Sequence, residues 1–349
     1  MRQVDALVVS FAFCLWDVPM STRQTCRALV TACLLVTTAA ASAQTKSQLT
    51  EHYVQGPFRI FYAVEGKSAV PLADSDSSGV PDHVEDVARQ VSAARELFCS
   101  VLKFPDPFQS KRYEGVNCIE ISLRERLEIG GGNGVAFESA QRAKKIDEGK
   151  PGDRTLVIAI GKHVDATKNI TPAHEFFHLI QYSTTYFKNR WYLEGQTRWA
   201  EHALHTGGVG DVKYSPRGPW PQKAMHLPLL FEMTYDAEFV LWNPIALRTD
   251  RRGELSEKEV PIALQRMQYS DGTPVVRDLA LNGAAVMRDI LLELGKQDDV
   301  AFKELGYKDW SEDNQRSPKN NPFIYQAIMD ALRRHTRPVG RFNAKSFSR

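Results

Sequence analysis

The chain has 349 residues, which is long enough for one large domain or two modest ones around a substantial buried core. Hydrophobic residues make up 43% and charged residues 25% of the sequence, as in globular proteins, and this composition excludes disordered and fibrous classes. The net charge of +2, without a long run of lysine or arginine, lacks the electrostatic signature of a nucleic-acid-binding protein, so nucleic acid is not an expected partner.

The N-terminal segment has the layout of a cleavable secretory signal. After Met20, two arginines precede an apolar run at 28–41, and a cleavage site of small residues ends at Ala43. The apolar run is too short to span a bilayer comfortably, so we expect no stable membrane insertion after cleavage. We predict that translation starts at Met20 and that cleavage follows Ala43. Residues 1–43 are then a signal region outside the fold, and the mature protein is secreted or periplasmic.

A strand is expected at 56–66, and a polar loop follows it. The loop "DSDSSGVPDHVE" matches the twelve-residue EF-hand frame, with oxygen ligands at the required positions, a glycine at the sharp turn and a glutamate at the end. We therefore expect a structural Ca²⁺ ion. The alternative is an acidic turn that caps the following helix without metal. The calcium ligands would be Asp74, Asp76, Ser78, Val80 (through its carbonyl), Asp82 and Glu85.

Apolar periodicity predicts the elements that follow. Residues 84–102 repeat at helical spacing, and β-rich runs at 116–123 and 155–160 predict strands on either side of a glycine-rich stretch. A helix is expected to begin with Thr171 as its N-cap and Pro172 in its first turn. Further helices are expected at 191–204, within 255–269 and 283–295, and near 323–334.

This order of elements predicts an α+β fold, because strands gather before residue 171 and helices after it. We expect two lobes. Residues 44–187 would form an N-terminal α+β lobe with a mixed sheet and the helix that begins at Thr171, and residues 188–349 a mainly helical C-terminal lobe.

Two cysteines, Cys99 and Cys118, remain once the signal region is removed. An even pair in a secreted chain predicts one disulfide bond. Two buried thiols that do not pair are the alternative, since the sequence does not supply the distance between them.

The stretch "TPAHEFFHLIQY" carries the strongest chemical signal. His174 and His178 are one helical turn apart, so both imidazoles can point at a single metal ion. Glu175 lies about 100° round the helix, where it can reach a water molecule at the metal without being a ligand. The alternative is an ordinary amphipathic helix, but the apolar residues around these histidines favour a buried helix, where polar side chains need partners.

The next helix offers Glu194 and Glu201, which share a face two turns apart. Because their separation along the axis is about 10 Å, they cannot both bind one ion. A catalytic zinc site has three protein ligands and an open position, so one glutamate would complete the set. The other could accept a hydrogen bond from one of the histidine ligands.

At these residues the chain resembles the gluzincins, zinc metallopeptidases with an H-E-x-x-H helix and a glutamate ligand from the next helix. The phrase "WYLEG" implies Glu194 as the third zinc ligand, with Glu201 in the supporting position. Glu201, His202 and His205 remain alternative ligands. The wider phrases "HEFFHLIQY" and "WYLEGQTRWAEH" are most similar to secreted bacterial proteins of metallopeptidase type, which also carry a D-x-D-x-x-G-x-P-D loop.

The resemblance implies a zincin-like fold and a secreted bacterial zinc metalloendopeptidase that acts on a peptide or protein substrate. Zinc would activate a water molecule, with Glu175 as the general base. The alternative is a catalytically inactive, calcium-stabilised binding protein with the same fold.

Such a site also needs a residue that stabilises the oxyanion and a strand that holds the substrate. In the resembling group a tyrosine often opens a late helix, where this chain has Asn282, and the other candidates to stabilise the oxyanion are Tyr235, Tyr269 and His226. The stretch 130–137 is either the edge strand that would hold a peptide substrate or a flexible loop.

Overall fold

The computed structural model describes residues 47–144, 154–204, 224–253, 255, 258–277 and 279–336. All of them belong to one compact unit, Lys46–Arg349. The predicted signal region, with its start at Met20 and its cleavage site after Ala43, lies outside the described residues. Within the described ranges, no helix is long and apolar enough to cross a membrane.

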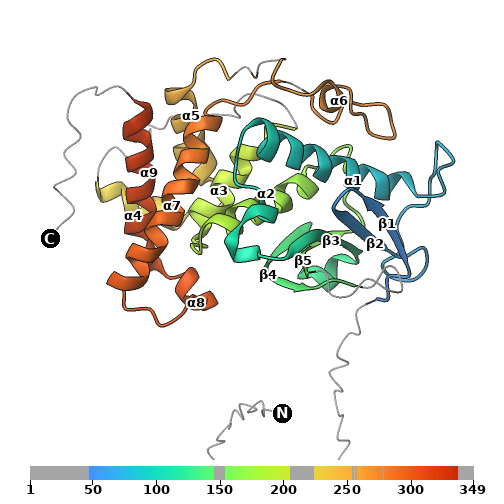
Figure 1. Cartoon of the computed structure of the whole chain (residues 1–349), viewed down its shortest axis with the longest axis horizontal. Helices are drawn as coiled ribbons and strands as arrows, with labels where there is room; N and C mark the ends of the chain where they lie inside the picture. The colour runs from blue at the N-terminus through green and yellow to red at the C-terminus, as the bar shows by residue number, and fades with distance from the viewer. Residues whose placement is uncertain are drawn as a thin grey trace, which may run out of the picture. The chain divides into compact units, whose positions relative to one another are not determined.

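The N-terminal half is built on a five-stranded mixed sheet with the strand order β1-β2-β3-β5-β4 (Figure 1). The three central strands are parallel to one another, and the two edge strands run antiparallel to their neighbours. The strands are β1 (Glu51–Gln55), β2 (Phe58–Tyr62), β3 (Val116–Arg124), β4 (Gly134–Arg142) and β5 (Arg154–Gly161).

Two helices cover one face of this sheet, α1 (Asp82–Arg95) and α2 (Thr171–Thr184). Ile60, Ile121 and Ile158 stand next to one another on the three central strands and are fully buried. Because side chains alternate between the faces of a strand, such a row forms a continuous apolar surface for the helices. The sheet and the two helices therefore share one hydrophobic core.

In the described residues after β5, every named element is helical, which confirms the predicted α+β class. The long helices α7 and α9 pack side by side, and α7 also contacts α2 (Figure 1). The elements are α3 (Arg190–Glu201), α4 (Leu227–Phe231), α5 (Asn243–Thr249), α6 (Ile262–Gln265), α7 (Ala284–Glu304), α8 (Glu312–Gln315) and α9 (Asn321–His335), with the π-helical turn η6 (Glu238–Trp242) before α5.

Two helix predictions need adjustment. The helix predicted at 84–102 is α1 followed by a π-helical segment, η1 (Glu96–Val101). Of the described residues within 255–269, where a helix is predicted, four are α-helical and form α6. Pro261 precedes α6, and a proline disfavours helical backbone in the residue before it.

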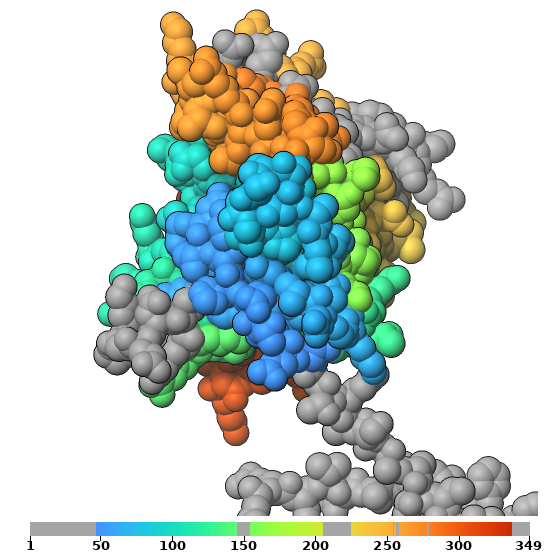
Figure 2. All heavy atoms as spheres, turned by 90° about the vertical axis from the view of Figure 1, so that its right-hand side faces the viewer, coloured from blue at the N-terminus to red at the C-terminus, as the bar shows by residue number. Residues whose placement is uncertain are grey.

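The segment after α6 returns to α1. The backbone N–H of Ser270 donates to Asp86 Oδ1 over 2.8 Å, and its hydroxyl donates to Asp86 Oδ2 over 2.5 Å. Figure 2 shows this orange segment lying against the blue N-terminal elements. These contacts attach a late part of the chain to the helix that follows the acidic loop.

The predicted disulfide is wrong, because the structure has no bond between Cys99 and Cys118. Cys99 Sγ lies 3.9 Å from the carbonyl oxygen of Pro105, whereas Cys118, in β3, has its Sγ 3.8 Å from that of Arg154. Each thiol faces a different carbonyl, and burial raises the pKa of Cys99 well above its usual range. Cysteine count does not report the distance between two cysteines, and here the fold separates the thiols.

A buried carboxyl group connects α7 to the C-terminal end of α2. Asp298 is 5% exposed and accepts hydrogen bonds from Thr185 Oγ1 (2.8 Å) and from the backbone N–H of Tyr186 (3.0 Å). Burial raises the pKa of Asp298 to about 7, against the lowering effect of these bonds. The carboxyl group is thus harder to ionise in the folded chain than in the unfolded one.

This shift predicts a pH-dependent stability. Below about pH 4, Asp298 is protonated in both states. Between about pH 4 and pH 7 the unfolded state has lost the proton and the folded state keeps it, so the free energy of unfolding falls across this range and is constant above it. We expect Asp298→Asn to remove this loss, by at most about 4 kcal/mol. Urea unfolding of both proteins at pH 5 and pH 8 measures the part of this loss that falls above pH 5, at most about 3 kcal/mol, and an equal change in the two would contradict the assignment.

Candidate metal centre

The helix that carries the histidines is held by its neighbours along its whole length. Twelve of the fourteen residues of α2 are buried. Pro172 lies in the first turn as predicted, but Thr171 is not the N-cap: the helix starts at Thr171, and its N–H and hydroxyl both donate to Asn169 Oδ1. The next free N–H, of Ala173, donates to the side chain of Gln90 in α1 over 3.0 Å. A side chain distant in sequence therefore does part of the capping.

His174 and His178 present their Nε2 atoms to one point, as their spacing predicts. The two Nε2 atoms are 3.1 Å apart, and the ring planes are perpendicular. Glu194, on α3, places its Oε2 atom 3.5 Å from Nε2 of His174 and 3.6 Å from Nε2 of His178. Helices α2 and α3 thus bring two nitrogens and one oxygen into a small triangle.

These separations fit a zinc ion. Three ligand atoms at about 2.0–2.1 Å from a tetrahedral ion lie about 3.3–3.4 Å from one another. Glu194 Oε2 is buried and has no hydrogen-bond partner among the described residues, which is costly for a charged oxygen unless an ion occupies the point that it faces. The donor set of two imidazoles and one carboxylate leaves a fourth position open, as in catalytic zinc sites.

The outer nitrogens of both histidines also have acceptors. His174 Nδ1 lies 2.7 Å from Glu201 Oε1, and His178 Nδ1 lies 2.9 Å from Gln181 Oε1. Gln181 is fixed in turn, because its Nε2 atom donates to the carbonyl oxygen of Leu193. When a metal ion displaces the protons from Nε2, each Nδ1 can donate to its outer acceptor and each Nε2 lone pair points at the central point, which is the tautomer that a metal ligand needs.

Glu201 therefore lies behind His174 and is not part of the group of atoms that faces the central point. Its second carboxylate oxygen accepts from Arg198 Nη1 over 2.7 Å. The alternative ligand His202 faces elsewhere, with Nε2 2.7 Å from the buried carboxylate of Glu238, and His205 lies outside the described residues. Of the candidate third ligands that the structure describes, only Glu194 joins the two histidines.

The charges of the cluster are strongly coupled. Burial disfavours protonation of His174, but the carboxylates of Glu194, 3.5 Å away, and Glu201, at hydrogen-bond distance, outweigh it and raise the pKa of His174 to about 10. Burial likewise disfavours the charged form of Glu194, yet His174 and His178 hold its pKa well below the usual range. The centre thus keeps a carboxylate facing the histidines at neutral pH.

Glu175 lies beside this cluster, under the edge strand β4. The residue is 5% exposed, and burial raises the pKa of its carboxyl group, opposed by the two histidines and by a backbone hydrogen bond from Ala136. Gly134 passes so close that a Cβ atom there would lie 2.7 Å from Glu175 Oε1. Of the two alternatives for residues 130–137, the structure shows an edge strand that begins at Gly134.

Three of the candidates for oxyanion stabilisation differ in their hydrogen-bond partners and in their exposure. Asn282 donates from Nδ2 to the carbonyl oxygen of Asp250, and Tyr269 bonds through its hydroxyl to Gln90. Tyr235 is 48% exposed; burial, followed by the charges of Glu194 and Glu175, raises the pKa of its hydroxyl. Among these three residues, Tyr235 is the one within electrostatic range of the metal-facing carboxylates.

The sequence-based interpretation missed Gln181 and Tyr182. Gln181 follows His178 by three residues, so helical spacing alone could have identified it as a neighbour. The Tyr182 ring stacks against that of His178 at 5.9 Å.

The acidic loop brings together part of the predicted calcium ligand set. Carboxylate oxygens of Asp74, Asp76 and Asp82 lie within 4.8 Å of one another. The Ser78 hydroxyl donates to the Val80 carbonyl oxygen over 3.3 Å, so both oxygens stay in the loop.

The last predicted ligand, Glu85, is turned toward Arg89, with a contact of 2.9 Å. The alternative, with Asp82 as a helix cap, does not describe this loop. Helix α1 begins at Asp82, and the Asp82 carboxylate accepts from Ser75 instead.

Comparisons with known proteins add nothing to this centre: no family model, no curated protein and no solved structure matches the chain.

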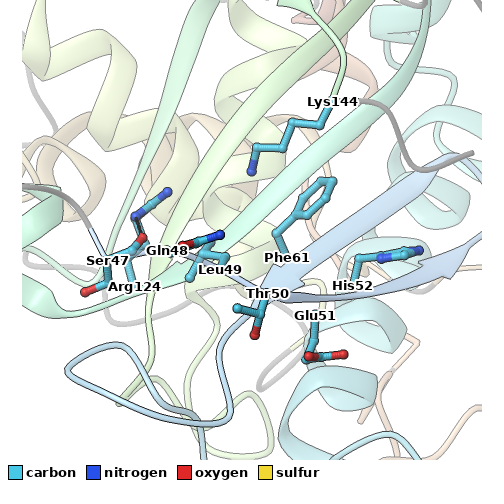
Figure 3. A pocket seen from close by; sticks show the side chains of 9 residues that line it. All are labelled: Ser47, Gln48, Leu49, Thr50, Glu51, His52, Phe61, Arg124 and Lys144. Atoms are coloured by element: carbon cyan, nitrogen blue, oxygen red, sulfur yellow. Dashed lines mark hydrogen bonds between the residues drawn. The ribbon is translucent and has the colours of Figure 1, made fainter. Parts of the chain in front are cut away.

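A pocket lined mainly by residues 47–52 shares no residue with the metal centre (Figure 3). In that pocket, Lys144 Nζ lies 3.8 Å from the centroid of the Phe61 ring. The lining residues are Ser47, Gln48, Leu49, Thr50, Glu51, His52, Phe61, Arg124 and Lys144.

Removing a ligand should abolish tight metal binding. We expect His178→Ala and Glu194→Gln to lose zinc, since two protein ligands do not hold a catalytic zinc ion tightly. Glu201→Gln should keep the site but weaken zinc affinity about 10- to 100-fold, because it loses the acceptor behind His174. Zinc content after dialysis against a competing chelator measures both effects. The control is Glu304→Gln, an exposed change at the end of α7; equal zinc content in all variants would refute the centre.

The acidic loop yields a separate prediction. Calcium should raise the unfolding temperature of the protein, and Asp76→Asn should reduce that rise, because it removes one of the clustered negative charges. Thermal scans with calcium and with a calcium-selective chelator, at constant zinc occupancy, make the test. An identical unfolding temperature in both conditions would show that the loop is stable without metal.

Proposed function

We propose that the protein is a secreted bacterial zinc metallopeptidase of gluzincin type, with a zincin-like, two-lobed arrangement around the α2–α3 pair. One observation carries the proposal. The Nε2 atoms of His174 and His178 and Oε2 of Glu194 converge within 3.1–3.6 Å of one another, with acceptors behind both histidines.

The chemistry divides between the metal and the residues around it. When bound, zinc supplies Lewis acidity, which lowers the pKa of a water molecule toward neutrality and polarises a scissile carbonyl. Glu175 takes the proton of the attacking water and delivers it to the leaving amine. Burial suits Glu175 to this role, since it raises the pKa of the carboxyl group toward the working pH.

The edge strand is the proposed substrate platform. Among the described residues, no strand pairs with the side of β4 that faces away from β5. Apart from the N–H of Ala136, which donates to Glu175, the N–H and C=O groups on this side can pair with an extended peptide. Because Gly134 and Ala136 lie against Glu175, a peptide added along β4 passes the metal centre.

The calcium loop and secretion belong to the same proposal. Calcium would play a structural role at Asp74, Asp76 and Asp82, which suits an environment where millimolar calcium is available. The proposed partners are peptides or proteins.

Glu175→Gln tests the function directly. The variant should lose peptide hydrolysis by about 10²- to 10⁴-fold, since the general base is gone, while it keeps its zinc. Casein hydrolysis and zinc content, measured on the same preparations, separate the two effects. Glu304→Gln is the control for a neutralised glutamate away from the centre.

Hydrolysis that survives Glu175→Gln, or that a zinc chelator does not inhibit, would refute the proposal. Zinc bound tightly by a wild-type protein that cleaves no peptide would favour the inactive binding protein instead.

A further inference from the structure

Arg190 extends the metal-facing side of α3 by one turn. At about 100° per residue, positions 190, 194, 197 and 201 lie within about 60° of one another on the helix. The last three all face the histidines: Glu194 faces both Nε2 atoms, Thr197 Oγ1 lies 3.3 Å from His178 Nδ1, and Glu201 contacts His174. Arg190 thus stands on the same side, about 6 Å along the axis from Glu194.

Arg190 differs from these residues in exposure and in charge. It is exposed, whereas Glu194, Thr197 and Glu201 are buried or half-buried. Among the described residues it forms no ion pair, although Arg198 on the same helix binds Glu201. The nearby basic residues Arg112 and Lys188 both bind Glu138, each over 2.8 Å. Arg190 therefore remains available to an anion from solution.

Tyr235 lies next to this guanidinium group. Its hydroxyl interacts with the Arg190 side chain and lies within electrostatic range of Glu194 and Glu175. Both side chains are exposed, so a ligand can reach them. A neutral phenol and a guanidinium are both hydrogen-bond donors, and a carboxylate accepts from both kinds of group.

We propose that Arg190 and Tyr235 form a subsite that binds a carboxylate group of the peptide substrate, within about two residues of the scissile bond. The distance follows from the rise of about 6 Å between Arg190 and Glu194 and the advance of about 3.3–3.6 Å per residue in an extended peptide. The subsite rests on the proposed function, since it names the substrate class of that centre.

The carboxylate can come from the C-terminus of a peptide or from an Asp or Glu side chain. Two series of fluorescent hexapeptides distinguish these sources. The first compares a free C-terminal carboxylate with a C-terminal amide, without acidic side chains. The second keeps the amide and compares one Glu with Gln at each position in turn.

Binding is measured by fluorescence anisotropy in the presence of zinc, on the full chain with Glu175→Gln, so that no peptide is consumed. We expect the carboxylate peptide of at least one series to bind about 10- to 100-fold more tightly than its neutral counterpart. Adding Arg190→Gln should reduce this ratio to about threefold or less, and Arg190→Lys should restore only part of it. Lys308→Gln, which removes an exposed charge after α7, should leave the ratio unchanged.

The series that responds to Arg190→Gln identifies the source of the carboxylate. Equal affinity of charged and neutral peptides in both series, or a preference that persists in Arg190→Gln, overturns the subsite. Hydrolysis by the protein with Glu175 intact is measured separately. Cleavage without a carboxylate preference refutes the subsite alone, whereas Arg190-dependent binding without cleavage refutes the proposed peptidase and leaves the subsite standing.

Discussion

The buried, unpartnered carboxylate oxygen of Glu194 is the constraint on which the rest of the centre depends. A charged oxygen removed from water destabilises the fold unless a cation lies beside it. Here the facing atoms are the Nε2 atoms of His174 and His178, on a helix whose neighbours bury nearly all of it. Helix α2 cannot rotate to expose them without losing the apolar contacts of Phe176 and Phe177. The hydrophobic core thus fixes three ligand atoms at one point.

Much of this centre could be predicted, because helical geometry is local. The spacing of His174 and His178 set their common direction, and the seven-residue spacing of Glu194 and Glu201 required different roles for the two carboxylates. The structure separates them as that spacing requires: one faces both Nε2 atoms, and the other accepts from the outer nitrogen of His174. Glu194 as the nearer one was suggested by resemblance, and the geometry agrees with it.

The features that escaped prediction depend on contacts between distant segments. Gln90, on another helix, caps the first turn of α2, and Asp298 accepts a hydrogen bond from the backbone just after α2. No periodicity in the sequence predicts either contact. The disulfide prediction was wrong for the same reason, since the fold decides whether two cysteines lie close enough to pair. Strand β4 begins in a run of glycines that could equally form a loop. Its role becomes clear only once Gly134 is seen against Glu175, where any side chain would collide with the carboxylate.

The acidic loop and the metal centre are connected through α1. The loop ends where α1 begins, at Asp82, and Gln90 follows two turns later on the same helix. The side chain of Gln90 accepts from the N–H of Ala173, immediately before His174, and donates to Tyr269. Asp86, which lies between Asp82 and Gln90 on α1, accepts a hydrogen bond from the backbone N–H of Ser270. A loop held by calcium would therefore fix the start of a helix whose next two turns position the first turn of α2. The ligand histidines depend on the order of α1 even though no residue of the loop reaches them, because buried polar side chains such as Gln90 stabilise the fold only when every partner stays in place.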